Sequence, residues 1–278
     1  MNVLSVIENF SNKGFVILKN AIPNKIVKDI QACILYSLKH KRNGKNKSTY
    51  KTFCNIVSKN KKKSFDFVKP INDEIYSNGF IEKILNQKKI YSLLSNILGK
   101  DLCFLVDNVV TLNIPNHNTP KKNYHFKDWH QEIWSGADLA TLQFWTPLFQ
   151  KNNNFGQIQL IPDSHKWGHI PHSNRKPLSL PKKFKTFEAK LNLGDIIFFS
   201  TTLMHRSSET LAPRLALPGQ VRNFRYSNRS FEYSRNWKIF SYSEITKIER
   251  ALGNHYLSPY RLLDKDQISN FDQGTIAK

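Results

Sequence analysis

The character of the sequence changes at Gly99, and this change constrains the fold more than any other feature. Before Gly99, apolar residues recur at helical spacing, as in the segment that Pro23 opens. After it, short apolar runs alternate with turn residues, at 102–106, 109–114, 140–145, 157–161, 184–189, 195–200 and 221–226. Short strands at this spacing predict an antiparallel sandwich or barrel. We therefore expect a mainly β fold with flanking helices.

The whole chain of 278 residues reads as one domain, since no internal repeat or long linker interrupts it. We expect residues 1–99 to form a mostly helical layer, apart from a strand at 14–18. Residues 100–240 would form the β core, and residues 241–278 a C-terminal helix and tail. The layer and the core would pack against each other.

Composition and segment lengths exclude several classes of protein. With 40% hydrophobic and 12% aromatic residues, the chain is too apolar for intrinsic disorder despite its net charge of +21. No apolar run approaches the ~20 residues of a membrane-spanning helix, and the N-terminus lacks the pattern of a secretory signal. The three cysteines are scattered, without a C-x-x-C spacing. We expect a cytoplasmic protein.

Positive charge is concentrated between residues 30 and 65, where ten Lys and Arg residues occur without any Asp or Glu. This segment predicts either a surface for an anionic partner, such as nucleic acid or a phosphorylated substrate, or a solvated loop in a chain rich in Lys and Asn. We favour the solvated loop.

A candidate metal site is formed by His130 and Glu132 in the segment Trp129–Trp134. If this segment is extended, the H-x-E spacing places the imidazole and the carboxylate on one side, because side chains alternate along a strand. A third ligand must come from elsewhere, and His205, directly after an apolar strand, is the best candidate. Two histidines and one carboxylate form the facial triad of non-haem Fe(II) oxygenases.

At this point the sequence resembles the phytanoyl-CoA dioxygenase family of Fe(II)/2-oxoglutarate oxygenases. Six segments carry the resemblance in the order of the family. They are the strand 14–18 with the Pro23 helix, WHQE at 129–132, LQFWTPL at 142–148, NNFGQ at 153–157 leading to IPDSHKWG at 161–168, Gly194-Asp195 before an apolar strand, and His205 after that strand.

The resemblance implies a double-stranded β-helix, a jelly-roll or cupin-like core with helices on one side. His130, Glu132 and His205 would bind Fe(II) and so form the catalytic centre. Arg214 would hold the distal carboxylate of 2-oxoglutarate, supported by the Ser207 hydroxyl, and Trp145 would line the cosubstrate pocket. Three departures from the family pattern are present. Glu132 stands where Asp is commoner, Asp163 stands where the family has a turn glycine, and Arg214 lies slightly closer to His205 than expected, so Arg222 is a rival for its role.

The expected function is therefore a dioxygenase that uses Fe(II), 2-oxoglutarate and O2. It would hydroxylate an unactivated C–H bond of a small or carrier-linked substrate and release succinate and CO2. The basic segment favours an anionic substrate. Desaturation or ring formation would use the same chemistry. The alternative is a non-catalytic jelly-roll module that binds nucleic acid or an acidic polymer through residues 30–65; because the triad is complete, we consider nucleic acid the less favoured partner.

Overall fold

The computed structural model describes residues 3–38, 49–60, 64–106, 109–115, 128–135, 137–151, 157–208, 210–225 and 237–251. Its α-helices are α1 Val3–Lys13, α2 Asn24–Ser37, α3 Thr49–Lys59, α4 Ser64–Ser77, α5 Phe80–Leu85, α6 Lys88–Leu98 and α7 Glu244–Ala251. Two 3-10 helices are η1 Glu132–Ser135 and η2 Ser164–Trp167. Among the described residues, we find no helix with the length and hydropathy that a bilayer crossing requires.

The strands form two principal sheets and a small hairpin. The larger sheet has the order β1-β9-β4-β11-β2-β12, with β3 also paired to β11, and the smaller has the order β10-β5-β8. Their bounds are β1 Phe15–Leu18, β2 Leu102–Leu105, β3 Thr111–Asn113, β4 Thr141–Phe149, β5 Ile158–Leu160, β8 Phe187–Ala189, β9 Ile196–Ser200, β10 His205–Ser207, β11 Arg214–Asn223 and β12 Trp237–Ser241. The hairpin pairs β6 His172–Ser173 with β7 Lys176–Pro177. All of these pairings are antiparallel.

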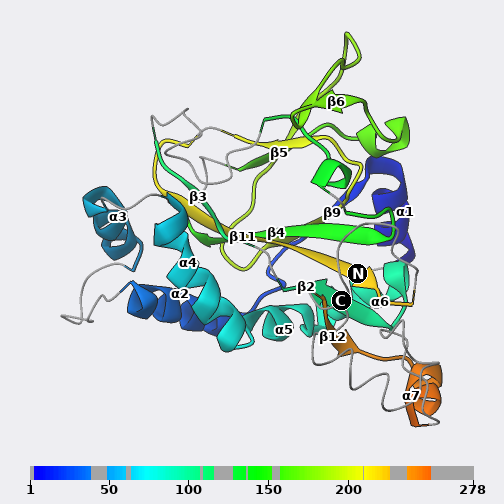
Figure 1. Ribbon diagram of the computed structural model, residues 1–278, viewed down its shortest axis with the longest axis horizontal. Coiled ribbons are helices and arrows are strands. Elements are labelled where there is room, and N and C mark those ends of the chain that lie inside the picture. Colours follow the sequence, from blue (N-terminus) through cyan, green and yellow to red (C-terminus); the bar gives the residue numbers. More distant parts are fainter. Residues whose placement is uncertain are drawn as a thin grey trace, which may run out of the picture.

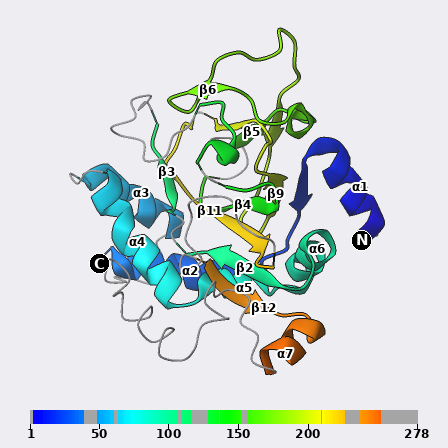
Figure 2. The same cartoon turned by 45° about the vertical axis from the view of Figure 1, so that its right-hand side comes forward.

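The larger sheet is buried on both faces, because its strands alternate between two apolar clusters. Phe144, Phe198 and Leu217 belong to the cluster that includes the helices, whereas Trp145 and Phe199 belong to one shared with the smaller sheet. Figure 1 shows α2, α4 and α5 along one side of the larger sheet and β5 on the other, and Figure 2 shows the same layering after rotation. The helical layer thus closes one face and leaves the other for a cavity.

Helix α3 corrects the expectation of a solvated loop between residues 30 and 65. Its Phe53 is fully buried and stacks on Phe149 of β4 at a ring-centroid distance of 4.4 Å. Its Tyr50 hydroxyl donates a hydrogen bond to the Pro213 carbonyl at 2.8 Å, directly before β11. Residues 39–48 and 61–63 of the basic segment lie outside the described residues.

Other boundaries differ from the sequence prediction in length. The strand expected at 221–226 is the end of β11, which begins at Arg214, and the strand expected at 140–145 continues to Phe149. The strand expected at 184–189 starts only at Phe187. These strands are longer or shorter than expected because pairing with neighbours, which local patterning does not show, sets their ends.

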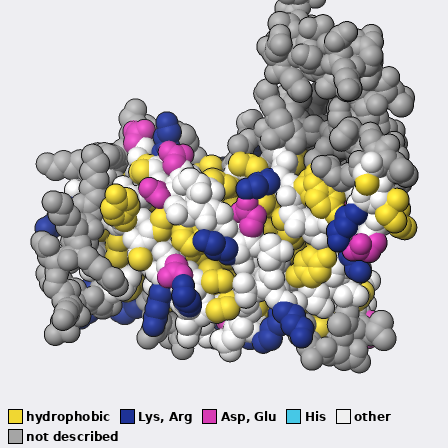
Figure 3. All heavy atoms as spheres, turned by 90° about the horizontal axis from the view of Figure 1, so that it is seen from below, with side chains coloured by type: hydrophobic (Ala, Val, Ile, Leu, Met, Phe, Trp, Pro, Cys, Tyr) yellow, Lys and Arg dark blue, Asp and Glu magenta, His cyan; other side chains and the backbone are white. Residues whose placement is uncertain are grey.

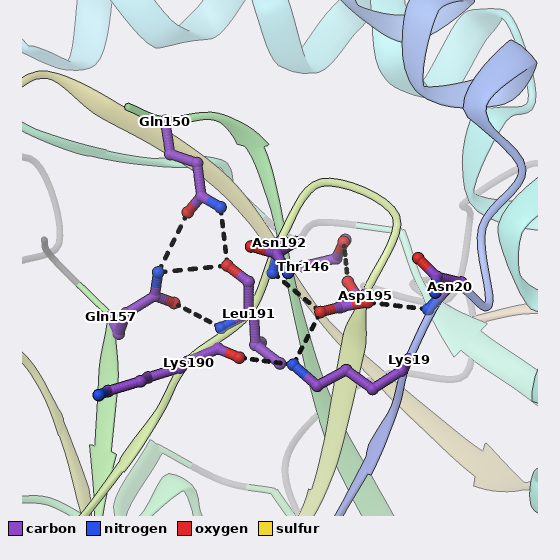
Figure 4. Close-up of polar contacts among 9 residues, drawn as sticks. All are labelled: Lys19, Asn20, Thr146, Gln150, Gln157, Lys190, Leu191, Asn192 and Asp195. Carbon is purple, nitrogen blue, oxygen red and sulfur yellow. Dashed lines mark hydrogen bonds and ion pairs between the residues drawn. The ribbon is translucent and has the colours of Figure 1, made fainter. Parts of the chain in front are cut away.

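Two polar clusters join the edges of the sheets (Figure 4). The Asp195 carboxylate, 1% exposed, accepts hydrogen bonds from Lys19 Nζ at 2.9 Å, from the Asn20 amide at 2.8 Å and from the Asn192 amide at 2.9 Å. The Gln150 side chain donates to the Leu191 carbonyl at 2.7 Å. These bonds hold the turn after β1 and the end of β4 against the segment that enters β9.

Candidate active site

The predicted triad comes together where a short segment crosses the end of β10. His130 and His205 form a β-bridge with backbone N–H···O distances of 3.0 and 3.1 Å. The extended backbone that was the condition for pairing His130 with Glu132 ends before Glu132, because the chain turns into η1 at that residue. The Glu132 carboxylate nevertheless reaches the two imidazoles. The Ile133 amide donates to the Thr201 carbonyl at 3.2 Å, which holds η1 near the segment before β10.

The donor atoms of the triad are arranged for a cation. Glu132 Oε1 lies 3.3 Å from His130 Nε2 and 3.4 Å from His205 Nε2, and one ligand atom from each residue lies within 4.8 Å of the others. All three residues are buried. Three electron-pair donors at this separation suit a divalent metal held by two histidines and a carboxylate.

The contacts of the second nitrogen of each imidazole support a metal site with Nε2 as the ligand atom. His130 Nδ1 donates to the Asp128 carbonyl at 2.7 Å, and His205 Nδ1 donates to the Leu203 carbonyl at 2.9 Å. Because a carbonyl only accepts, both Nδ1 atoms carry their proton, and in the neutral rings both Nε2 atoms then offer a lone pair. Such backbone contacts fix the tautomer and ring orientation of metal-binding histidines.

Gln131, between the two ligands in sequence, anchors the segment from the opposite side. Its side chain is fully buried and donates to the carbonyls of Gly168 at 2.8 Å and Thr202 at 2.6 Å. Its carbonyl oxygen accepts from the Ile170 amide at 2.9 Å. Gln131 therefore fixes the ligand-bearing segment against the turn before β10, a role that the sequence analysis did not assign.

A cavity of about 180 Å³ lies between the two sheets and contains the triad. All six residues that the sequence analysis assigned to the site line this cavity: His130, Glu132, Trp145, His205, Ser207 and Arg214. The remaining lining residues are Val109, Thr111, Gln143, Gln157, Ile158, Phe199, Arg206, Pro218 and Gln220.

Arg214 is a buried cation without a counter-charge among the described residues. Its side chain is 1% exposed, and neither Nε nor Nη1 has a hydrogen-bond partner. Its guanidinium carbon lies 5.1 Å from the centroid of the Trp145 ring. Burial lowers the pKa of Arg214 to about 9. An unpaired guanidinium in a cavity is suited to bind a carboxylate in a bidentate, charge-assisted contact.

Arg222, the rival of Arg214, occupies a different environment. Its Nη1 donates to Asp138 Oδ2 at 3.2 Å, and its guanidinium carbon lies 4.1 Å from the centroid of the Trp237 ring. Arg222 is absent from the cavity lining. Because Asp138 follows η1 closely in the chain, this ion pair ties the segment after Glu132 to the end of β11.

The third departure noted in the sequence, Asp163, lies at the turn before η2. Its φ is 66°, in the left-handed region that favours glycine. The turn thus keeps the conformation that a glycine would adopt, with an aspartate in its place. No described contact joins Asp163 to the triad.

Comparisons with known proteins agree with this architecture. A family model described as "Phytanoyl-CoA dioxygenase (PhyH)" matches residues 10–216. No curated protein sequence matches the chain.

Three solved structures share the fold at low sequence identity. The non-heme monooxygenase ThoJ in its apo form has a TM-score of 0.58 and 17% identity, covering 86% of this chain and 84% of that chain. The epimerase SnoN in complex with Fe3+, alpha ketoglutarate and nogalamycin RO has a TM-score of 0.54 and 13% identity, covering 84% and 88%. The alpha ketoglutarate dependent carbocyclase SnoK has a TM-score of 0.52 and 11% identity, covering 84% and 95%. The predicted jelly-roll with flanking helices is confirmed.

Proposed function

The chain belongs to the phytanoyl-CoA dioxygenase family, and from this premise we propose that it is an Fe(II)- and 2-oxoglutarate-dependent dioxygenase that hydroxylates an unactivated C–H bond. Bound iron and 2-oxoglutarate supply, with O2, the oxidant for that bond and release succinate and CO2. One observation carries the proposal: a single cavity contains both a buried triad of electron-pair donors and an unpaired buried arginine.

Some residues of the cavity would bind the metal and others the cosubstrate. His130, Glu132 and His205 would hold iron through Nε2, a carboxylate oxygen and Nε2. Arg214 would bind the distal carboxylate of 2-oxoglutarate. This carboxylate would offset the free-energy cost of burying the Arg214 charge without a counter-charge. Ser207, which follows His205 by two residues and faces the same cavity, would donate its hydroxyl to that carboxylate. The Trp145 ring, beside the guanidinium, would exclude water from the pair.

An anaerobic titration tests this assignment. Fe(II) and 2-oxoglutarate together should give the weak visible charge-transfer band of a chelated cosubstrate, and His205→Ala should abolish it. Arg214→Met should weaken 2-oxoglutarate binding while leaving metal binding intact. The matched control is Arg222→Met, whose guanidinium lies outside the cavity lining. No band in the wild type, together with unchanged metal binding in His205→Ala, would refute the proposal.

Hydroxylation is proposed as the reaction, with desaturation and ring formation as the competing outcomes of hydrogen abstraction. Among the structures with this fold are a monooxygenase, an epimerase and a carbocyclase, so the fold leaves the outcome to the substrate. Under ¹⁸O2, a hydroxylase transfers one labelled oxygen atom to its product. An unlabelled product that has lost two hydrogen atoms would identify a desaturase or cyclase.

We propose a small or carrier-linked molecule, with an anionic group outside the cavity, as the substrate. Support comes from the basic segment, in which the Tyr50 hydroxyl of α3 donates a hydrogen bond to the Pro213 carbonyl, directly before the strand that carries Arg214. The rival proposal, nucleic acid binding, requires a continuous basic surface. On the face shown in Figure 3, the described Lys and Arg side chains are interspersed with acidic and apolar ones. Substrate turnover that is independent of added polynucleotide would support the enzyme.

We also propose that residues 1–278 form one catalytic domain located in the cytoplasm. One apolar cluster contains residues of the helices and of the larger sheet, such as Ile34, Ile71 and Phe198, which favours a joint folding unit. The three cysteines are unpaired, as is usual in a reducing compartment. Limited proteolysis and cell fractionation would test these two points.

A further inference from the structure

Two glutamines stand side by side on the wall of the cavity. Gln143 of β4 and Gln220 of β11 are register partners in adjacent antiparallel strands. Each is 6% exposed, and both line the cavity. Cross-strand partners have neighbouring side chains on the same face of a sheet, so the two amides form a pair that faces the smaller sheet.

The carbonyl oxygen of each amide has no hydrogen-bond partner in the described structure, although both oxygens are buried. Other buried glutamines of the chain are satisfied: Gln131 makes three hydrogen bonds to backbone groups, and Gln150 donates to Leu191. Buried polar groups without partners are uncommon in folded proteins and indicate a missing ligand or a strained site. Two of them side by side in a cavity indicate a ligand.

The pair lies at the metal end of the cavity. Gln143 is also the register partner of Phe199, whose ring centroid lies 4.6 Å from that of His205. Arg214, by contrast, is six residues before Gln220 on the same strand, about 20 Å away along the chain at the rise of a β-strand. Trp145 and its partner Pro218 stand between them. The cosubstrate carboxylate and the amide pair are therefore separate subsites.

We propose that Gln143 and Gln220 bind the substrate through a neutral hydrogen-bonding group, an amide or a hydroxyl, next to the C–H bond that reacts. This inference rests on the proposed function. The primary amide of a glutamine has hydrogen-bond donors and an acceptor but no charge. It can therefore pair with a ligand amide or hydroxyl, which also has both a donor and an acceptor. An ionised group would lie buried beside them without a counter-charge, which is unfavourable.

The other charges of the cavity are already balanced. Arg214 is matched to a carboxylate of 2-oxoglutarate, and Glu132 to the metal. Arg206 donates through Nε to Gln159 Oε1 at 2.7 Å and stacks over the Trp129 ring at 4.6 Å. Arg206 also borders the cavity, but its Nη1 lies 3.8 Å from Asp128 Oδ1, so its charge already has a partner. Gln159 alternates along β5 with the buried Ile158 and Leu160, so its side chain lies on the outward face of the smaller sheet. An anionic group of the substrate therefore belongs outside the cavity.

The test uses three probes of similar size, benzamide, benzyl alcohol and benzoate, on zinc-loaded protein saturated with 2-oxoglutarate. Saturation-transfer NMR gives their affinities. We expect benzamide and benzyl alcohol to bind at least about tenfold more tightly than benzoate. The double variant Gln143→Leu/Gln220→Leu should lose about tenfold in benzamide affinity, consistent with one or two hydrogen bonds, and should keep its affinity for 2-oxoglutarate.

The matched control is Gln159→Leu, which removes a glutamine from the outward side of the smaller sheet and should leave benzamide affinity unchanged. Thermal unfolding gives a second readout: the double variant should be no less stable than the wild type, because it loses no described hydrogen bond, whereas Gln150→Leu should be destabilised. Failure of benzamide to bind the wild type, or unchanged benzamide affinity in the double variant, overturns the inference. Loss of 2-oxoglutarate affinity in the double variant also overturns it. Failure of the wild type to bind 2-oxoglutarate would instead refute the proposed function itself.

Discussion

Arg214→Met should make the free protein more stable while removing its response to 2-oxoglutarate. Burial lowers the pKa of Arg214 to about 9, and at 1.36 kcal/mol for each pKa unit this depression corresponds to a penalty of about 5 kcal/mol for the charged side chain. Solvent that enters the cavity would reduce that penalty. We therefore expect the methionine, which fills a similar volume without charge, to raise the free energy of unfolding by about 1–3 kcal/mol.

Thermal unfolding with and without ligands measures this effect. At this chain length, 1 kcal/mol corresponds to about 2–4 °C in the melting temperature, so the free variant should melt several degrees above the wild type. Addition of metal and 2-oxoglutarate, each at 100 times its Kd, should stabilise the wild type by about 2.7 kcal/mol for each ligand. The variant should gain only the contribution of the metal. Arg222→Met should lower stability instead, because Asp138 loses its ion-pair partner.

The pH dependence of the same comparison has a defined sign. The folded protein binds the Arg214 proton more weakly than the unfolded chain does, because burial lowers the pKa of that guanidinium to about 9. The free energy of unfolding of the variant should exceed that of the wild type by the largest amount below pH about 9. This excess should shrink as the pH rises above that value. A variant that melts well below the wild type at neutral pH would refute the reasoning, since it would mean that Arg214 is paired in the free protein.

Three further substitutions test other parts of the structure. Glu132→Ala should lower metal affinity, measured by calorimetry, by about 100-fold or more. Unchanged affinity would show that the triad is not the metal site. Asp195→Asn should lower the free energy of unfolding by about 1–3 kcal/mol in urea, because the carboxylate accepts from Lys19 and two backbone amides, and should leave metal affinity intact. Gly219→Ala should cost about 1–3 kcal/mol, because its Cβ would meet the Phe144 ring at 2.1 Å; an unaffected melting temperature would show that the ring moves aside freely.

Local sequence patterns were sufficient for the layout of the fold. Apolar spacing before Gly99 predicted helices, and α2 and α6 lie where that spacing indicates. The apolar run after Gly194 predicted a core strand, which is β9. Helix α3 was missed because its lysines obscure a narrow apolar face, of which Phe53 and Val57 are buried. Its position depends on a contact with Phe149 almost a hundred residues later in the chain.

In the candidate site, too, local sequence predicted some features, while long-range contacts set the others. His130 and Glu132 could be paired from their spacing on the condition of an extended segment, but Glu132 starts a 3-10 helix. Gln143 could have been placed in the cavity from the sequence, because it shares a strand face with Trp145. Gln220 could not, since the register between β4 and β11 depends on long-range pairing with a bulge at Leu215/Ala216.

The sequence by itself determined the chemistry available to this protein: two histidines, a carboxylate and a candidate arginine, in an order typical of a jelly-roll. Only the tertiary structure distinguished the surroundings of the two arginines. Both lie on β11, and their local sequence does not separate them. Arg222 forms an ion pair with Asp138 from a distant loop, whereas Arg214 is buried in the cavity without a hydrogen-bond partner among the described residues. The physical reason is that the cost of a buried charge depends on what surrounds it, and the packing of distant segments supplies those surroundings.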